Sequence, residues 1–412
     1  MVMISKHLRG YLDSSVSNEI TIEDIRELRK INSEDKEKAN SITKQRRSGK
    51  EDIREIDRQI SSLPENQQSS ALRWSLYKSI LEDQQYDGFM MRYPFGNVVK
   101  KPGLSYFYRG EKEAYPSTIP SLTRHLDKFC NKEEKHIEQI VADLRVIEFY
   151  LLVKDFTYMK EFTNRGISIL YDVIAQHYHL KTFFLDITSD FDVALFFACC
   201  SYDDNKQQWR PLSRNEIKRK ESGVLYQGCQ FVSEDPNARL IDGSNQSPVF
   251  PVGYQPFFRC SNQYAYAVYL PYPYELLERT IGFRKFFFKH DHKMCQEIFE
   301  TMEGGKVLYP EEGLLRLQDQ INSIASAKVF TEESIDILAK QMELPTEILL
   351  NKLKTFQYSS SSGALYNVSQ ANFDAINAYY DEHNIFRNLQ IMIRKVYPGK
   401  PNDSPKKSSI LE

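Results

Sequence analysis

The sequence predicts an α+β fold, in which a mixed helix and strand core domain is flanked by helical N-terminal and C-terminal regions. Apolar residues recur at three- and four-residue steps in several segments, which is typical of amphipathic helices. Short aromatic or β-branched runs lie between these segments and indicate strands. The two kinds of segment follow one another without a regular βαβ alternation, so we expect an α+β domain.

The composition is that of a globular protein able to bury a substantial core. The chain has 412 residues, of which 41% are hydrophobic and 13% aromatic, and this length predicts two or three domains. Its 54 basic and 56 acidic residues give a net charge of -2, so no global field draws it to nucleic acid or to an anionic membrane. Six cysteines without a CxxC pair favour reduced thiols and a cytoplasmic location. The first residues do not resemble a signal peptide, and nowhere do eighteen apolar residues run together.

Residues 1–95 are predicted to form a helical N-terminal region. Segments 20–31 and 72–81 carry apolar residues at helical spacing. Residues 35–58, between them, are crowded with charges and cannot bury a face, so we expect a solvated helical hairpin or a mobile linker there.

The core domain is predicted to span residues 96–328. It begins with LSYFYRGE at 104–111, a short aromatic run that reads as a strand. Residues 133–159 are expected to form a long amphipathic helix, residues 169–177 a shorter one, and residues 191–200 an apolar helix. Further strands are expected at 183–187, 223–227, 264–270 and 284–289, with a polar excursion at about 203–221.

Two C-terminal segments follow, a small helical pair at 329–358 and a C-terminal helix with a disordered tail at 359–412. The pair breaks at Pro345 and could be a helix-turn-helix, but its three lysines against five acids argue against contact with DNA phosphates. The run SSSSG at 359–363 predicts a flexible joint, a further helix is expected from Ser369, and the tail after Pro398 is expected to be disordered.

A first candidate for chemistry is Arg109, which ends the first core strand directly before Gly110. An arginine there can present its planar fork to a phosphate or carboxylate, while the glycine lets a ligand approach closely. The alternative is a surface arginine in a turn.

Further candidates interrupt the apolar run QHYHLKTFFLDITSDFDVALFFACC at 176–200. His177 lies on the apolar stripe of its helix, so it is either a core histidine or a residue that faces a ligand. Tyr178 offers an aromatic face to a flat ring or simply fills space. Asp186 lies too early to cap the next helix, whereas Ser189 or Asp190 fits that N-cap.

A metal-like cluster is formed by His290, Asp291, His292 and Cys295, since HxH with a nearby cysteine can supply two or three zinc ligands. No second cluster in the sequence completes such a site, and KHDHK fits a solvated strand end equally well, so we expect no metal. The sequence also contains no Walker loop and no GxGxxG, GxSxG or HExxH signature.

Taken together, these pieces resemble the FRG domain, a family named for a Phe-Arg-Gly motif. The resemblance covers about residues 104–324 and rests on YRG at 108–110, PSL at 120–122 with Arg124, AQHY at 175–178, Thr182, LD at 185–186, Thr188, ALFFA at 194–198, NQYAY at 262–266 and LYP at 308–310. Three departures occur. Tyr108 replaces the usual Phe, Glu111 replaces a common Gln, and residues 179–188 read HLKTFFLDIT where the family often reads GLPTRLLDWT.

The order of these parts is similar to that of ADP-ribosyltransferases, so the resemblance implies an ADP-ribosyltransferase-like fold with NAD as substrate. It implies catalytic roles for Arg109, His177, Asp186 and Gln263, and cofactor contacts from Tyr108, Gly110, Tyr178, Thr188 and Ser189. In this scheme an arginine grips the diphosphate and Tyr178 holds the nicotinamide. Gln263 can hold a ribose hydroxyl but carries no charge, so Asp186 or Glu111 would have to stabilise the oxocarbenium-like transition state.

Three hypotheses about function remain open. The first is an enzyme that transfers ADP-ribose from NAD to a protein or nucleic-acid acceptor, or hydrolyses NAD, as a bacterial effector in stress or defence. The second is a non-catalytic ligand-binding or protein-interaction module, in which Arg109, His177 and Asp186 form a buried network. The third is a nucleic-acid-associated effector that uses basic C-terminal residues, namely Arg387, Arg394, Lys395, Lys406 and Lys407. A nucleotide-type small molecule is the expected partner and a membrane is not, while the oligomeric state is left open.

Overall fold

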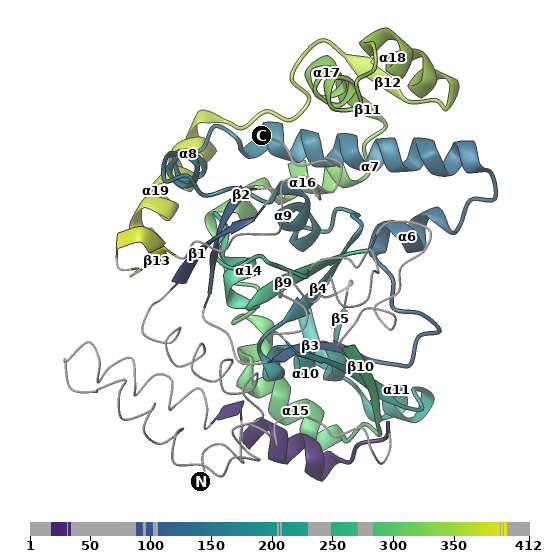
Figure 1. Cartoon of the computed structure of the whole chain (residues 1–412), viewed down its shortest axis with the longest axis vertical. Helices are drawn as coiled ribbons and strands as arrows, with labels where there is room; N and C mark the ends of the chain where they lie inside the picture. Colours follow the sequence, from purple (N-terminus) through teal and green to yellow (C-terminus); the bar gives the residue numbers. More distant parts are fainter. Residues whose placement is uncertain are drawn as a thin grey trace, which may run out of the picture.

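A computed structural model shows an α+β fold with one six-stranded antiparallel sheet at its centre (Figure 1). The structure describes residues 18–30, 32–33, 88–93, 96–101, 106–203, 206, 208–229, 249–270, 283–387, 389 and 391–393. The predicted fold class is therefore confirmed. The predicted helix at 72–81, the charged segment 35–58 and the tail after Pro398 lie outside the described residues.

The central sheet has the strand order β10-β7-β3-β4-β9-β8. Its strands are β3 (Tyr106–Glu111), β4 (Phe184–Thr188), β7 (Gly223–Cys229), β8 (Val249–Pro251), β9 (Ala265–Tyr269) and β10 (Phe283–Phe288). The predicted strands at 183–187, 223–227, 264–270 and 284–289 correspond to four of these. Between β3 and β4 a single residue pair, Tyr108 with Thr188, is in register. The sheet therefore consists of two three-stranded halves that meet at this pair and part beyond it.

The two faces of the sheet differ in what covers them, because successive side chains of a strand point to opposite faces. On one face, Phe107, Ile187 and Tyr226 belong to one apolar cluster. On the other face, Tyr108 and Leu225 belong to a different cluster, which includes helix α10 (Phe191–Cys199). Tyr108 meets Phe191 of α10 edge to face, with ring centroids 5.0 Å apart.

Gly110 allows α10 to pack directly on β3. A Cβ atom at this position would lie 1.8 Å from the backbone oxygen of Ala194, which no real Cβ could tolerate. The side-chain oxygen of Asp190 accepts the amides of Asp192 and Val193 and caps α10, so the capping alternative for Asp190 is confirmed. The sequence therefore places a strand end and a capped helix in contact beside Arg109.

Further helices pack against the sheet or against one another, and Figure 1 shows α17 and α18 at one end of the molecule and α15 near the other. They are α6 (Ser121–Leu126), α7 (Lys132–Val153), α8 (Thr157–Asn164), α9 (Tyr171–His177), α11 (Arg214–Arg219), α14 (Phe258–Asn262), α15 (His292–Thr301) and α16 (Gln318–Ala325), with 3-10 turns η2 (Glu303–Gly305) and η3 (Gly313–Leu317). The predicted long helix 133–159 is broken after Val153. The break lets Phe156 stack on Phe373, with ring centroids 5.3 Å apart.

The C-terminal part contains the predicted helical pair, as α17 (Glu332–Gln341) and α18 (Thr346–Thr355), and the predicted further helix, as α19 (Gln370–Glu382). Buried Glu148 of α7 accepts hydrogen bonds from the Thr331 amide, the Thr331 hydroxyl and the Ser334 hydroxyl, which ties the pair to the core. The run SSSSG was expected to be a flexible joint. Instead its first residues form β12 (Ser359–Ser361), which pairs in parallel with β11 (Val329–Thr331). This pairing satisfies backbone N–H and C=O groups of the serine run, which the serine side chains cannot do alone.

The N-terminal region is not wholly helical. Residues 22–30 form a helix that buries Ile25 and Leu28 in the α10 cluster. Strand β1 (Gly88–Tyr93) lies within the region predicted to be helical and pairs with β2 (Gly96–Lys100) and with β13 (Ile391–Ile393). The polar excursion at 203–221 holds β6 (Gln208–Pro211), which pairs with β5 (Cys200–Asp203). A last 3-10 turn, η4 (Ile385–Arg387), precedes β13.

Candidate functional site

Arg109 lies where the ladder between β3 and β4 ends. Its Nε donates to Oε1 of Glu111 at 3.0 Å, and its Nη1 donates to the backbone oxygen of Asp186 at 2.7 Å. Across the other edge of β4, Asp186 is paired with Ala267 of β9. No residue of β3 pairs with Asp186 of β4, and the Arg109 guanidinium bonds to the Asp186 backbone oxygen in place of a strand partner. Its side chain keeps 22% of its exposure, so one edge of the fork remains open.

Glu111 is already committed to protein contacts. Its side chain is only 5% exposed, and its Oε2 accepts the hydroxyl of Thr118 at 3.0 Å. That hydroxyl lies 2.6 Å from the Tyr226 hydroxyl. Because both carboxylate oxygens are occupied and buried, Glu111 is placed to hold Arg109 rather than to meet a substrate.

His177 and Asp186 lie side by side on the other face of the sheet. Nε2 of His177 is 3.9 Å from Oδ1 of Asp186, which is an ion-pair distance but too long for a hydrogen bond. Both atoms are buried, and neither has a hydrogen-bond partner among the described residues. The Asp186 side chain is nevertheless 36% exposed, so its carboxylate reaches the surface beside the histidine.

Electrostatics favour the neutral form of His177. Burial lowers the pKa of this imidazole, the nearby Asp186 carboxylate opposes that shift, and Arg259 adds to it. A neutral histidine beside a carboxylate can accept a proton, which is the role of a general base.

Arg259, at α14, is a central part of this site that sequence reasoning missed. Its Nη1 donates to the backbone oxygen of His177 at 2.7 Å. Its guanidinium lies 4.3 Å from the Tyr178 ring centroid and 5.4 Å from that of Tyr309. Its Nε is buried and makes no hydrogen bond within the described part of the chain. The motif LYP at 308–310 pointed to Tyr309, but no sequence signal marked the arginine in PFFRCSN.

Glu312 contacts Arg259 and three of its neighbours through its carboxylate. Its carboxylate is fully buried and lies 4.0 Å from Nε of Arg259. It accepts hydrogen bonds from the Tyr178 hydroxyl, from the Tyr380 hydroxyl at 2.8 Å and from the Phe258 amide at 2.9 Å. Burial raises the pKa of Glu312, and these hydrogen bonds together with Arg259 counteract that rise. No sequence motif marks this residue, because its partners come from three distant segments.

All five residues expected to contact a cofactor are buried in the fold. Tyr108 and Tyr178 are each 1% exposed, Ser189 2% and Thr188 5%. The Tyr178 ring faces Arg259 and its hydroxyl is bonded to Glu312, so it presents no open face to a nicotinamide. The fifth residue, Gly110, contacts α10. These residues frame the site, and the cofactor roles assigned to them stay predictions.

Gln263 lies at the C-terminal end of α14, directly before the turn that leads into β9. Its backbone oxygen accepts the Thr188 hydroxyl at 2.7 Å, and its Nε2 donates to the Leu308 oxygen at 3.3 Å. The next residue, Tyr264, has a φ of 48°, a left-handed turn that leads the chain into β9. Gln263 therefore links β4, α14 and the LYP segment behind Asp186.

His179 explains one departure from the family pattern. Its φ is 75°, a left-handed conformation that glycine adopts without cost and that histidine tolerates better than β-branched residues do. The family often has glycine at this position, so the backbone turn after AQHY fits the family even though the residue differs.

The site residues therefore form two groups. His177, Asp186, Arg259, Tyr309 and Gln263 gather on the helix-covered face of the sheet, and Arg109 with Glu111 lies on the opposite face. The Arg109 guanidinium donates to the backbone oxygen of Asp186 where β3 and β4 part, and this hydrogen bond links the two groups. The arrangement can bind an anion at Arg109 and perform acid-base chemistry at His177 and Asp186.

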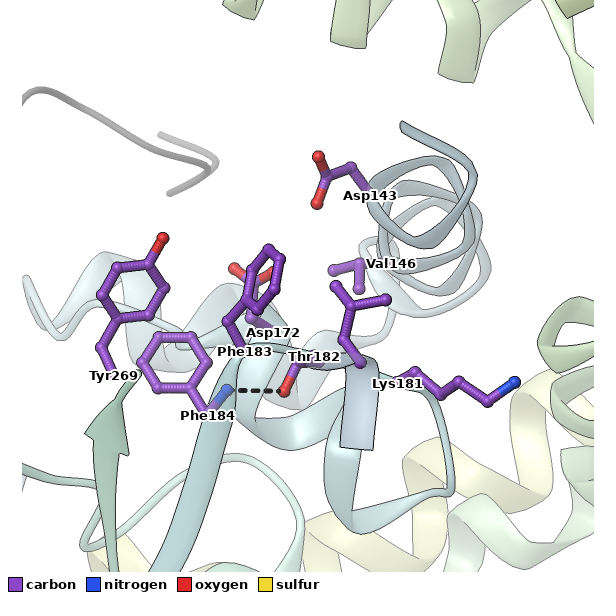
Figure 2. Close-up of a pocket in the computed structure, with 9 residues that line it drawn as sticks. Asp143, Val146, Asp172, Lys181, Thr182, Phe183, Phe184 and Tyr269 are labelled. Carbon is purple, nitrogen blue, oxygen red and sulfur yellow. Dashed lines mark hydrogen bonds between the residues drawn. The ribbon is translucent and has the colours of Figure 1, made fainter. Parts of the chain in front are cut away.

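A separate small pocket lies between α7, α9 and the start of β4 (Figure 2), lined by Leu122, Asp143, Val146, Asp172, Lys181, Thr182, Phe183, Phe184 and Tyr269. Figure 2 shows Lys181 extending away from the two carboxylates. Burial raises the pKa of Asp143 to about 8, with a further contribution from Asp172, and it raises the pKa of Asp172 to about 7. Of the family-motif residues, this pocket contains Thr182 and Leu122, but none of the predicted catalytic residues.

The described residues give little basis for nucleic-acid contact. Arg387 donates to Asp381 at 2.9 Å, and the other basic residues proposed for that role, Arg394, Lys395, Lys406 and Lys407, lie outside the described residues. Within the described segments, no helix is both long and apolar enough to cross a membrane.

Comparison with known proteins identifies one domain. The model of the FRG domain family matches residues 104–207, a span that holds Arg109, His177 and Asp186 but ends before Arg259 and Gln263. No curated protein and no solved structure matches the chain, so the ADP-ribosyltransferase-like fold stays a prediction. The chain therefore contains an FRG domain at residues 104–207.

Proposed function

We propose that the FRG domain binds an NAD-like nucleotide where β3 and β4 part, and that it cleaves the bond between nicotinamide and ribose. The observation that carries this proposal is the state of the Asp186 carboxylate. It is partly exposed, its Oδ1 makes no hydrogen bond to any described residue, and it lies beside a histidine whose neutral form is favoured. Glu111, the other carboxylate considered for the role, is buried and occupied.

Asp186 would supply the charge that Gln263 lacks. When the bond from C1′ to the nicotinamide nitrogen breaks, neutral nicotinamide leaves and positive charge develops on the ribose. A fixed carboxylate next to C1′ stabilises that charge, and such stabilisation is commonly the largest single term in catalysis. Water or an acceptor hydroxyl then attacks C1′ and gives its proton to His177, which the lowered pKa keeps ready to accept it.

Arg109 would hold the diphosphate. Glu111 and the Asp186 carbonyl engage its Nε and Nη1, and this fixes the plane of the guanidinium before a ligand arrives. The open edge of the fork is then available to a phosphate oxygen, which arginine binds well because its geometry matches. On the other face of the sheet, Tyr309 lies beside Arg259. Its ring would make the nicotinamide contact that was expected of Tyr178.

The test is nicotinamide release from NAD by the purified full-length chain. Asp186→Asn should lower the rate by about 100-fold or more, as loss of one preorganised electrostatic group commonly does. The same substitution at exposed Asp319 in α16 should leave the rate unchanged. No release by the wild-type protein, or equal rates in the wild type and Asp186→Asn, would overturn the proposal.

A second candidate is a non-catalytic ligand-binding or protein-interaction module. It is favoured by the extent to which the expected cofactor residues are buried and by the contacts that already occupy Arg109. This candidate predicts that NAD raises the melting temperature of the protein without any release of nicotinamide. The two candidates are therefore separated by adding a thermal shift measurement to the turnover assay.

A further inference from the structure

A second polar cluster lies in the apolar core between α10 and α15, away from the candidate site. The Sγ atoms of Cys199 and Cys295 and a ring nitrogen of His290 all lie within 4.8 Å of one another. Cys199 ends α10, Cys295 lies in the first turns of α15, and His290 follows β10. Three elements that are distant in sequence thus bring two thiols and an imidazole to one point.

The orientation of His290 identifies the nitrogen that faces the thiols. Its Nε2 lies 2.8 Å from the backbone oxygen of Lys112, so it carries the proton and donates it. Nδ1 therefore holds a free lone pair, and this atom is buried with no hydrogen-bond partner in the described segments. Edge-to-face contact with Phe288, with ring centroids 5.1 Å apart, further fixes the ring. A histidine whose second nitrogen is held by a carbonyl is the usual arrangement of a metal-bound imidazole.

The surroundings also suit a metal ion with an affinity for sulfur. Both cysteines are fully buried, within a cluster that includes Phe196, Met294 and Ile298. In a tetrahedral zinc site, bond lengths of about 2.3 Å to sulfur and 2.0–2.1 Å to nitrogen place neighbouring ligand atoms about 3.3–3.9 Å apart. Since the three ligand atoms lie within 4.8 Å of one another, each pair would need to close by at most about 1.5 Å to reach that geometry. The unpaired lone pair of Nδ1 in an apolar core is costly, and a bound cation would satisfy it.

We propose that Cys199, Cys295 and Nδ1 of His290 bind a Zn²⁺ ion that fastens α15 to α10. Sequence reasoning noticed His290 and Cys295 but expected no metal, because the third ligand lies far earlier in the chain. The neighbours noticed with them have other roles or positions. Asp291 caps α15 by accepting the Met294 amide at 2.8 Å, and His292 is not part of the cluster.

The proposal can be tested with Co²⁺ as a spectroscopic probe, added to the full-length protein after treatment with a chelator and a reductant. Thiolate-to-cobalt charge transfer reports sulfur ligands directly. The wild type should bind one Co²⁺ with such a band, and Zn²⁺ should displace it. Cys199→Ser and Cys295→Ser should each weaken binding by more than about 10- to 100-fold, since loss of even an outer partner of a ligand costs that much. Cys260→Ser, the same change at a buried cysteine of α14 outside the cluster, should retain the band.

A measurement on the wild-type protein guards against variants that fail to fold. Zn²⁺ should protect Cys199 and Cys295 from an alkylating reagent under mild denaturant, as peptide mapping can show, while Cys260 gains no protection. Absence of a charge-transfer band in the wild type, a band that survives in both serine variants, or equal alkylation with and without Zn²⁺ would overturn the proposal.

Discussion

Replacing Glu312 with alanine tests how much the buried polar contacts of this carboxylate contribute to the stability of the protein. The substitution removes the acceptor of three hydrogen bonds, from the hydroxyls of Tyr178 and Tyr380 and from the Phe258 amide. It also leaves the Arg259 guanidinium, 7% exposed, without the carboxylate 4.0 Å from it. Each of these losses leaves a buried polar group without its partner.

The expected magnitude follows from these contacts. Each unsatisfied buried donor costs about 1–3 kcal/mol, and breaking a buried ion pair on one side costs about 3–5 kcal/mol. The two costs are not added together, because both include the buried groups that lose Glu312 as their partner. The mutation also relieves the burial of a carboxylate whose pKa is raised in the fold, so the lower part of the range applies. We expect the free energy of unfolding to fall by about 3–4 kcal/mol.

Urea denaturation followed by circular dichroism provides the assay, with a matched control in the adjacent residue. Glu311→Ala removes an exposed carboxylate one position earlier in the chain and should change the free energy of unfolding by less than about 0.5 kcal/mol. A loss below about 1 kcal/mol for Glu312→Ala, or equal losses for the two variants, would refute the reasoning that this network holds Arg259 in place.

Three further predictions concern the frame of the site. Gly110→Ala should destabilise the protein by about 1–3 kcal/mol or more in urea denaturation, because its Cβ meets the Ala194 oxygen, whereas Gly363→Ala, with nothing within 4 Å, should be nearly neutral. Asp143→Asn should make the protein more stable than the wild type by about 1–2 kcal/mol at high pH, after allowance for solvent screening. The folded pKa of Asp143 is raised to about 8, so the stability of the wild type is complete below the ordinary pKa of 3.8 and falls as the pH rises through 8. The gain in melting temperature of Asp143→Asn over the wild type should therefore shrink as the pH falls. A gain that stays constant with pH would count against the raised pKa of Asp143. Glu148→Ala should lower the free energy of unfolding by about 2–4 kcal/mol and detach α17 and α18, seen as faster proteolysis after residue 328; unchanged proteolysis would contradict the role of this carboxylate.

Much of the fold could be predicted from local patterns in the sequence. The helix at 191–199 and the strands at 223–229, 265–269 and 283–288 have periodic or continuous apolar residues, which is why they appear close to their expected bounds. Boundaries were wrong where tertiary contacts decided them. Phe156 ends the long helix because its ring packs on Phe373, and the serine run forms a strand because β11 lies beside it.

The candidate site was only partly predictable, because its geometry depends on strand register. His177 and Asp186 were identified, and they lie side by side. That Arg109 lies on the opposite face of the sheet follows from the pairing of Tyr108 with Thr188, which one sequence cannot reveal. Arg259 escaped notice because it comes from a short helix with no motif, and it acquires its role only through contacts with segments far away in the chain.

We propose that an NAD-like ligand lies where β3 and β4 part, next to Asp186. A crystal structure of the protein with a non-cleavable NAD analogue tests this most directly, since it locates the ligand without requiring turnover. We expect the diphosphate within hydrogen-bonding distance of Arg109 and the nicotinamide ribose beside the Asp186 carboxylate. An analogue bound in the pocket of Asp143 and Asp172, or elsewhere on the chain, with the Asp186 carboxylate untouched, would contradict it.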